Sequence, residues 1–305
     1  MITYSAPGKV YLFGEHAVVY GMDAICFAIN LRTFVTVTPN ANINSVKIIS
    51  SIGTTGIDFK IHPFVSHAIE KMRCLVEING ITLTIKSEIP IGSGLGSSAA
   101  VIVATISALN ELYKLNLTKT EIAKYANEVE MKVQGRASPT DTYICTMGGL
   151  HFIKSKDVEA LESIDVGIVI GNTNKFSSTK TQVECVKSLY EKYFDIINPI
   201  ILNIGNLSEI GKQFIIKKDY QSLGTLMNIN HGLLDAIGVG SLELSALIYK
   251  AREKGAYGAK ITGAGGGGCM VAICDKSKTN KIKSALDEFG TAIITKPTKE
   301  GVRLE

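Results

Sequence analysis

A cluster of glycines and serines near residue 95 has the composition of a ligand-binding turn. It reads Gly92-Ser93-Gly94-Leu95-Gly96-Ser97-Ser98 and runs into an apolar stretch typical of a buried helix. Glycine permits backbone angles that other residues avoid and lets a ligand approach the main chain. Unpaired N–H groups at the start of a helix favour an anion. The pattern predicts a polyphosphate-binding turn, and the alternative is a tight strand-to-helix turn without a ligand.

This cluster differs from the two best-known phosphate-binding motifs. No Gly-Lys-Ser/Thr follows it, which excludes a Walker loop, and its GxGxGSS spacing is not the GxGxxG of a dinucleotide fingerprint. A serine hydroxyl at the start of the helix could ligate Mg²⁺. The sequence therefore predicts a phosphate site of another kind.

A second glycine cluster occupies residues 263–268. It places five glycines in six residues between two apolar segments. A plain hairpin of that composition would cost substantial chain entropy. The cluster favours a loop whose backbone packs against a ligand or another loop, and an ordinary flexible hairpin is the alternative.

Two acidic residues, Glu130 and Asp141, flank a turn that contains Pro139. Glu130 lies off the apolar stripe of its predicted helix and in the last turn, where a carboxylate is electrostatically disfavoured. A cation such as Mg²⁺ would relieve that conflict, whereas local sequence alone favours a solvated surface side chain. For Asp141, a turn-stabilising role is the alternative to a catalytic one.

Three charged or titratable residues near the N-terminus are poorly placed for a plain core. Lys9 lies just inside an apolar strand, and Glu15 and His16 follow that strand directly. Lysine is rarely buried without a partner. A lone histidine is more often structural, so the prediction of a site here depends on the three residues together.

Four segments in a fixed order resemble the motifs of the GHMP small-molecule kinases, most closely the compact archaeal mevalonate kinases. They are APGKVYLFGEHAVVYG from Ala6, SEIPIGSGLGSSAA from Ser87, the Glu130-to-Asp141 stretch that contains SPTD, and KITGAGGGGC from Lys260. One such motif could occur by chance, but four in the family order are highly specific.

The resemblance implies a mixed α/β fold, of the α+β two-layer kind. The N-terminal domain would resemble ribosomal protein S5 and the C-terminal domain would be ferredoxin-like, with ATP and substrate held between them. A polar stretch at 154–159 is the best linker candidate, and a new buried strand begins at Asp165. We therefore predict domains at residues 1–163 and 164–305.

The resemblance also implies roles for individual residues. The loop from Gly92 to Ser98 would wrap the ATP phosphates, and Ser87 would contact the nucleotide. The predicted ATP-binding residues are Ser87, Gly92, Ser93, Gly94, Leu95, Gly96, Ser97 and Ser98.

The remaining implied roles concern the metal, the reaction and the acceptor. Ser98 and Glu130 match the Mg²⁺ ligands of the family. Asp141 matches the proposed base, which either accepts the alcohol proton or mainly orients the hydroxyl, and Lys9 matches its partner. The predicted substrate-side residues are Glu15, His16 and Thr179.

The implied activity is Mg·ATP-dependent phosphorylation of the 5-hydroxyl of mevalonate, an early step toward isoprenoids. Another acceptor of the same family (phosphomevalonate, homoserine or galactose) is the first alternative, although Ala17-Val18-Val19-Tyr20 replaces the Asp-Tyr of the galactokinase signature. A decarboxylase of the same fold and a non-catalytic nucleotide-binding relative are further alternatives. Thr140, where many members have Ser-Gly, and the large Arg136 are departures near Asp141.

Composition excludes several broad classes of protein. The chain has 305 residues, 46% of them hydrophobic, and a net charge of +4, so disorder is excluded and nucleic acid is not an expected partner. No apolar stretch reaches the length of a membrane span, and the N-terminus lacks the pattern of a signal peptide. The six cysteines show no ligand-like spacing and are expected to be buried thiols. We expect a cytoplasmic protein without a membrane partner, and a homodimer by analogy with the family.

Overall fold

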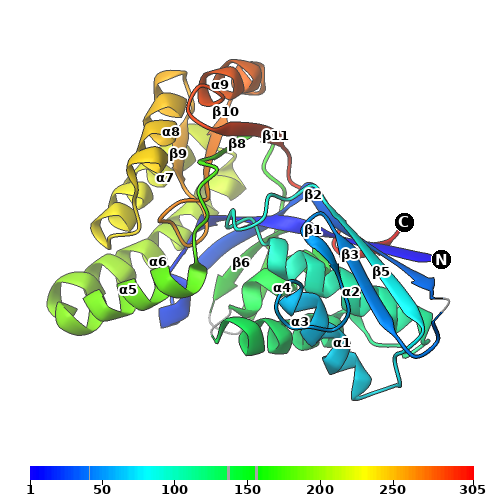
Figure 1. The fold of residues 1–305 in the computed structure, drawn as a ribbon. Coiled ribbons are helices and arrows are strands. Elements are labelled where there is room, and N and C mark those ends of the chain that lie inside the picture. The colour runs from blue at the N-terminus through cyan, green and yellow to red at the C-terminus, as the bar shows by residue number, and fades with distance from the viewer. Residues whose placement is uncertain (41, 136–137, 155–156) are drawn as a thin grey trace.

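The computed structural model describes residues 1–40, 42–135, 138–154 and 157–305. Figure 1 shows two lobes, each built from a sheet and the helices packed on it. The mixture of helices and strands predicted for both halves of the chain is confirmed. The predicted boundary near residue 163 falls between a strand of the first sheet at Asp157–Leu161 and the first strand of the second sheet at Gly167–Asn172. The division into domains stays a prediction.

The sheet of the first lobe has two long neighbouring strands at its centre. Its order is β12-β1-β2-β5-β3-β4, with β6 pairing with both β2 and β7. In the second half of β2 and in β5, buried apolar residues alternate with partly exposed threonines, which suits a sheet with one buried face. The strands are β1 (Ile2–Phe13), β2 (Ala24–Pro39), β3 (Val46–Ser50), β4 (Gly53–Thr55), β5 (Ile81–Ser87), β6 (Leu150–Lys154), β7 (Asp157–Leu161) and β12 (Arg303–Leu304).

Helices that cover this sheet carry much of the candidate site. They are α1 (Pro63–Arg73), α2 (Ser97–Leu112), α3 (Lys119–Gln134) and α4 (Pro139–Met147). Helix α2 is apolar around most of its surface, which is typical of a buried helix, and it packs on β1 and β2. Thr118 and Glu121 form a capping box at the start of α3, and Gly135 ends that helix in the left-handed conformation.

The second lobe is a sheet of order β11-β8-β10-β9, antiparallel throughout, with helices packed on it. Its strands are β8 (Gly167–Asn172), β9 (Gly258–Ile261), β10 (Cys269–Cys274) and β11 (Thr291–Thr295). Its helices are α5 (Thr179–Lys192), α6 (Phe194–Lys217), α7 (Tyr220–Ala236), α8 (Leu242–Glu253) and α9 (Thr279–Leu286), and short 3₁₀ turns lie at η1 (Ala17–Tyr20) and η2 (Lys276–Lys278).

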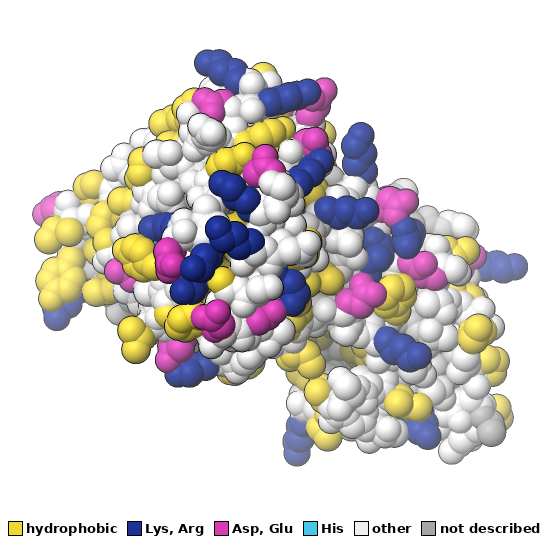
Figure 2. All heavy atoms as spheres, turned by 90° about the horizontal axis from the view of Figure 1, so that it is seen from above, with side chains coloured by type: hydrophobic (Ala, Val, Ile, Leu, Met, Phe, Trp, Pro, Cys, Tyr) yellow, Lys and Arg dark blue, Asp and Glu magenta, His cyan; other side chains and the backbone are white. Residues whose placement is uncertain are grey.

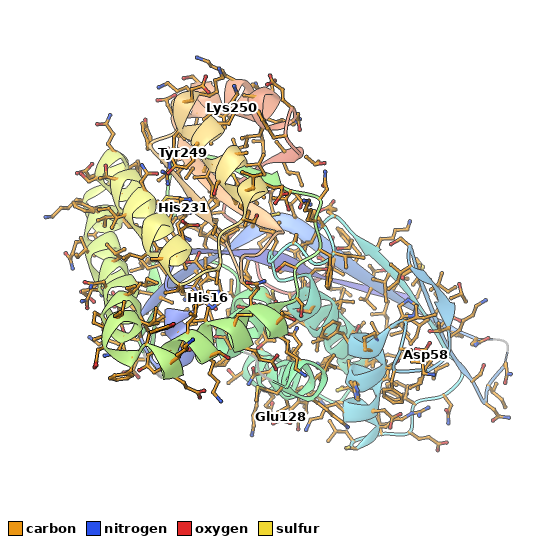
Figure 3. All side chains as sticks on the ribbon, turned by 60° about the vertical axis from the view of Figure 1, so that its left-hand side comes forward. His16, Asp58, Glu128, His231, Tyr249 and Lys250 are labelled. Carbon is orange, nitrogen blue, oxygen red and sulfur yellow. The ribbon has the colours of Figure 1, made fainter. Side chains whose placement is uncertain are left out.

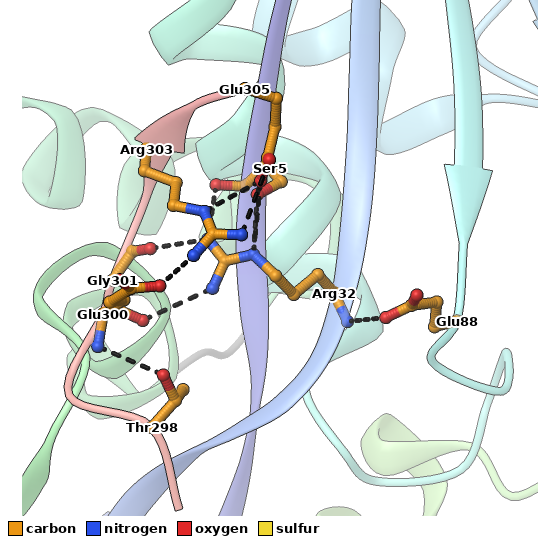
Figure 4. Close-up of polar contacts among 8 residues, drawn as sticks. All are labelled: Ser5, Arg32, Glu88, Thr298, Glu300, Gly301, Arg303 and Glu305. Atoms are coloured by element: carbon orange, nitrogen blue, oxygen red, sulfur yellow. Dashed lines mark hydrogen bonds and ion pairs between the residues drawn. The ribbon is translucent and has the colours of Figure 1, made fainter.

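The end of the chain returns to the first sheet. Strand β12 pairs with β1, and Figure 4 shows the buried Arg32 of β2 at this junction. Its guanidinium donates to the carbonyl oxygens of Gly301 at 2.7 Å and Ser5 at 3.0 Å. Because an arginine side chain has no acceptor, it can hold several backbone carbonyls at once. The C-terminal segment is thereby fixed beside the strand that carries Lys9.

The surface and the cysteines bear on the expectations from composition. On the face in Figure 2, Lys and Arg side chains lie among Asp and Glu side chains.

Cys26, Cys145, Cys269 and Cys274 are buried as expected, but Cys74 and Cys185 are exposed, which corrects the expectation for these two. Of the helices in the described ranges, none combines the length and apolarity that crossing a membrane requires.

Candidate active site between the two lobes

A cavity of about 1200 Å³ lies between the lobes and gathers most of the predicted site residues. Figure 3 shows His16 in this region, between the two lobes. The predicted residues that line the cavity are Lys9, Glu15, His16, Ser87, Gly92, Ser93, Gly94, Gly96, Ser97, Ser98, Glu130, Asp141 and Thr179. Leu95 is the exception, because its side chain is fully buried in the core. Segments far apart in the chain therefore meet at one site.

The glycine turn before α2 exposes backbone N–H groups to the cavity. Gly92, Gly94 and Gly96 all have φ between 67° and 78°, a conformation that glycine adopts without strain. Gly96 is the N-cap of α2, and it offers no side chain to cap the first turn. The first N–H groups of Ser97 and Ser98 are thus placed at the positive end of the helix dipole, which suits a phosphate.

Three of the residues predicted to bind the nucleotide have internal hydrogen-bond partners. Ser93 Oγ donates to the Pro90 carbonyl at 2.6 Å, and Ser87 Oγ donates to the Ile89 carbonyl at 3.1 Å. The Leu95 carbonyl accepts from the Lys9 backbone N–H at 2.9 Å. These bonds fix the shape of the turn. Ser87, Ser93 and Leu95 therefore help to position the neighbouring residues of the turn.

The second glycine cluster packs directly on the first. A Cβ built on Gly263 would lie 2.9 Å from Gly94 Cα, and one on Gly94 would lie 3.0 Å from the Thr262 carbonyl oxygen. The Cys269 N–H donates to the Ser93 carbonyl at 3.0 Å. The prediction of a loop packed through its backbone is confirmed, and its partner is the other glycine turn.

Ser98 and Glu130 lie side by side at the start of α2 and the end of α3. Ser98 Oγ donates to Glu130 Oε1 at 2.6 Å, while Glu130 Oε2 is buried and has no hydrogen-bond partner among the described residues. Burial, and next the negative charge of Asp141, raise the pKa of the Glu130 carboxyl to about 7. Glu130 is therefore a buried carboxylate, not a solvated one, and these oxygens could hold a divalent cation.

Lys9 and Asp141 form an ion pair on the floor of the cavity. Lys9 Nζ lies 3.0 Å from Asp141 Oδ2 and donates to the Gly94 carbonyl oxygen at 3.1 Å. Burial acts to lower the pKa of the Lys9 ammonium, but the Asp141 carboxylate outweighs it and the pKa is raised. Asp141 Oδ1 is buried with no partner in the described part of the chain. One oxygen thus pairs with the lysine and the other is available to an incoming group.

A second ion pair, missed in the sequence analysis, holds Glu15. Lys260 Nζ of β9 donates to Glu15 Oε1 and, at 2.6 Å, to the Ile261 carbonyl, and Asn230 Nδ2 donates to Glu15 Oε2 at 3.3 Å. Both charged side chains are at most 1% exposed. Burial raises the pKa of the Glu15 carboxyl and lowers the pKa of the Lys260 ammonium, and each charge opposes the shift of the other.

The signal for Lys260 was present in the sequence. It is a lysine inside an apolar strand, the pattern that singled out Lys9. Because Glu15 is paired across the lobes with Lys260, its carboxylate joins the second lobe to the end of β1 while it lines the cavity.

His16 and Thr179 approach the cavity from opposite lobes. His16 Nε2 lies 2.9 Å from the Ala264 carbonyl oxygen of the second glycine cluster. Its φ of 61° is unusual for a residue other than glycine, and such strain occurs often at functional sites. Burial lowers the pKa of the His16 imidazole, and the bond to Ala264 opposes that shift. Thr179 is the first residue of α5.

The arrangement is suited to phosphoryl transfer. It combines backbone N–H groups for phosphate oxygens, a carboxylate with a hydroxyl beside them, and an ammonium–carboxylate pair a short distance further along the cavity. Phosphoryl transfer depends on positioning and charge neutralisation more than on covalent chemistry by the protein. Arg136, a departure noted near Asp141, lies outside the described residues; Thr140 is buried in the first turn of α4.

Comparison with known proteins agrees with this chemistry. The sequence model of the GHMP kinases N terminal domain matches residues 63–149, and that of the GHMP kinases C terminal matches residues 212–292. The chain is 43% identical to the mevalonate kinase of Pyrococcus abyssi, over 100% of this chain and 98% of the relative. The chain belongs to the GHMP kinase family. The predicted family and fold are confirmed.

Solved structures of the same family have the same fold. The crystal structure of the Methanococcus jannaschii mevalonate kinase superposes with a TM-score of 0.85 at 28% identity, covering 97% of this chain and 98% of that one. The L. major mevalonate kinase in complex with R-mevalonate gives 0.85 at 27% identity, covering 97% and 96%. A galactokinase galactose-binding signature also matches residues 2–39, the segment that contains Lys9, Glu15 and His16.

The contact between the two glycine turns gives a first prediction. Gly263→Ala should weaken ATP binding by about tenfold, or about 1.4 kcal/mol, because the new Cβ would push against Gly94 and displace the phosphate turn. Titration calorimetry with ATP measures the change. The matched control is Gly21→Ala, which has a similar φ of 81° but no heavy atom of the described residues within 4 Å of the new Cβ. An equal loss of ATP affinity in both variants would mean that backbone strain alone causes it, and would contradict the role of the contact with Gly94.

The buried pair across the lobes gives a second prediction. Lys260→Met should lower the free energy of unfolding by about 3–5 kcal/mol, because it leaves the Glu15 carboxylate buried without a partner. The double variant Lys260→Met/Glu15→Gln should recover part of that loss. Denaturant unfolding measures both. Lys187→Met, which breaks an exposed pair with Glu191, should change little; a similar cost there would contradict the role of burial.

Proposed function

We propose that this protein is a mevalonate kinase, which transfers the γ-phosphoryl group of ATP to the 5-hydroxyl of mevalonate. The observation that carries the proposal is the Lys9–Asp141 pair in the same cavity as the uncapped start of α2. A phosphate-binding turn alone would suit many nucleotide-binding proteins. The pair adds what transfer to an alcohol requires: a group to hold the hydroxyl and a cation beside the oxygen that gains the phosphoryl group.

Asp141 and Lys9 divide the work at the acceptor. Asp141 Oδ1 has no partner in the described residues and is free to accept a hydrogen bond from the alcohol. It orients the hydroxyl and takes its proton as the oxygen attacks phosphorus. The Lys9 ammonium stabilises negative charge on the acceptor oxygen and on the transferring group. The Gly94 carbonyl and Asp141 hold that ammonium in place.

Mg²⁺ fits the oxygens beside the phosphate turn. Among the described residues, no group of three or more His, Cys, Asp or Glu side chains could by itself hold a metal, and Mg²⁺ in kinases needs only one or two protein oxygens beside the phosphates. Glu130, whose Oε2 is an orphaned buried oxygen, and the adjacent Ser98 hydroxyl would hold the ion. When bound, Mg²⁺ would neutralise charge on the phosphates.

Part of the cavity lining favours a substrate that is partly hydrocarbon. Val18, Val19 and Val183 line the cavity, as do Thr179 and Lys180. Apolar walls suit the methyl-bearing chain of mevalonate, and a lysine near the start of α5 suits a carboxylate. The galactose-binding signature at residues 2–39 makes galactose a specific second candidate.

The test is an assay of ADP release with Mg·ATP and four acceptors: mevalonate, phosphomevalonate, homoserine and galactose. We expect turnover with mevalonate and only background with the others. Asp141→Asn should lower kcat with mevalonate by about 10²–10⁴-fold, the usual range for general-base assistance. Lys9→Met should lower kcat with mevalonate as well.

Asp157→Asn, an exposed position on β7, is the matched control and should keep normal turnover. Faster turnover with galactose than with mevalonate would contradict the proposal and identify galactose as the acceptor. Near-normal turnover of Asp141→Asn would remove its catalytic role and leave the kinase activity to be explained by positioning alone.

The metal assignment has its own prediction. Glu130→Gln should raise the Mg²⁺ concentration for half-maximal activity by about tenfold or more, because a neutral amide is a weaker ligand for a hard cation than a carboxylate. Glu128→Gln is the control on the same helix: Glu128 is paired with Lys71 at the surface and lies on the outer side of the lobe in Figure 3. An unchanged Mg²⁺ requirement in Glu130→Gln would exclude Glu130 as a ligand.

A further inference from the structure

Tyr11 is a buried aromatic residue on the same strand as Lys9. The two residues are two positions apart on β1, and side chains alternate along a strand, so both face the same side of the sheet. Tyr11 is only 5% exposed and yet lines the cavity. Neither the motifs nor the mechanism above gives it a role.

The Tyr11 ring borders the Lys9 ammonium. Lys9 Nζ lies 4.6 Å from the ring centroid, within the distance at which a cation is attracted to an aromatic face. The ammonium also contacts oxygens of Asp141 and Gly94. The two oxygens restrict the ammonium from two directions, and the ring borders it from a third. Removing the ring would leave room for the flexible lysine side chain to move away from the acceptor.

The Tyr11 hydroxyl reaches the helix that carries Asp141. It donates to Ser138 Oγ at 3.5 Å, and Ser138 is the N-cap of α4, with its Oγ accepting from the Thr140 N–H at 3.3 Å. Burial raises the pKa of the Tyr11 phenol well above its usual value, so the hydroxyl keeps its proton and can donate. Tyr11 thereby contacts the partner of Asp141 and the cap of the helix that carries it.

The backbone of Tyr11 is held by the opposite lobe. Its N–H donates to Thr262 Oγ1 at 3.2 Å, and Thr262 Oγ1 donates to its carbonyl at 3.3 Å. Thr262 immediately precedes the second glycine cluster. The Tyr11 side chain is therefore anchored at a point where β1, α4 and the glycine-rich loop meet.

We propose that Tyr11 is a positioning residue for phosphoryl transfer. Its ring holds the Lys9 ammonium toward the reacting oxygens, and its hydroxyl supports the first turn of α4 and so the position of Asp141. This inference rests on the proposed function, because it gives Tyr11 a part in the same transfer step. The distance from the ring to the ammonium lies within the usual range for its kind of contact, whereas the 3.5 Å hydroxyl contact is at the long limit for a hydrogen bond. We therefore expect the ring to account for most of the effect of Tyr11 on the transfer rate.

The test compares Tyr11→Phe, which keeps the ring, with Tyr11→Leu and Tyr11→Met, which remove it. We expect the two ring-less variants to lower kcat by about tenfold or more, with KM for ATP changed by less than about twofold. Tyr11→Phe should stay within about threefold of the unmodified enzyme. Kinetics are measured with whichever acceptor of the panel the unmodified enzyme phosphorylates fastest, so that a wrong acceptor and a wrong role for Tyr11 give different results.

The matched control is Phe13→Leu, an aromatic-to-leucine change on the same strand. Phe13 is fully buried and packs on Gly211 of α6, away from Lys9. It should lower the melting temperature and leave kcat within about twofold. If Phe13→Leu and Tyr11→Leu lowered kcat equally, the Tyr11 ring would be a core residue only, and the proposal would be wrong.

A double-variant cycle tests whether Tyr11 acts through Lys9. In a Lys9→Met background, Tyr11→Leu should lower the remaining kcat by less than about twofold, because the group that the ring positions is gone. The same tenfold loss in both backgrounds would overturn the proposal. Each rate is divided by the active fraction of its protein sample before the two rates in a background are compared. A general loss of folded protein then does not affect the ratio.

Discussion

The ion pair between Lys9 and Asp141 is the interaction on which the site depends. A lysine that is 3% exposed requires a partner, and its partner comes from a helix that begins some 130 positions later in the chain. The pair can form only if β1 and α4 lie in a fixed relation. The Gly94 carbonyl oxygen and the Tyr11 ring also border the ammonium.

A second constraint is the close approach of two glycine-rich turns from different lobes. The glycine turn before α2 keeps its shape because Gly263 packs against Gly94 and the Cys269 N–H donates to the Ser93 carbonyl. Side chains on either turn would hold the backbones apart. Glycine is thus required both for the backbone angles of the phosphate turn and for the contact that supports it. The two glycine clusters form one structural unit.

The lobes are further joined by buried charge. Glu15 and Lys260 neutralise each other beside the cavity, and His16 contacts the Ala264 carbonyl of the second lobe. A pair of this kind adds little net stability compared with apolar side chains, but it penalises any arrangement that separates its members. It therefore favours one relative placement of the lobes, the one in which the phosphate turn, Asp141 and Lys9 line the same cavity.

The sequence by itself determined the local features: the glycine turn, the capping box of α3, its end at Gly135, and the order of motifs that identifies the family. These depend on backbone preferences and on residues close in the chain. Tertiary structure alone decided that Glu130 is buried, that Leu95 lies in the core, and that Lys260 pairs with Glu15, 245 positions away. Burial and charge pairing depend on which distant segments meet, and no local pattern encodes that distance.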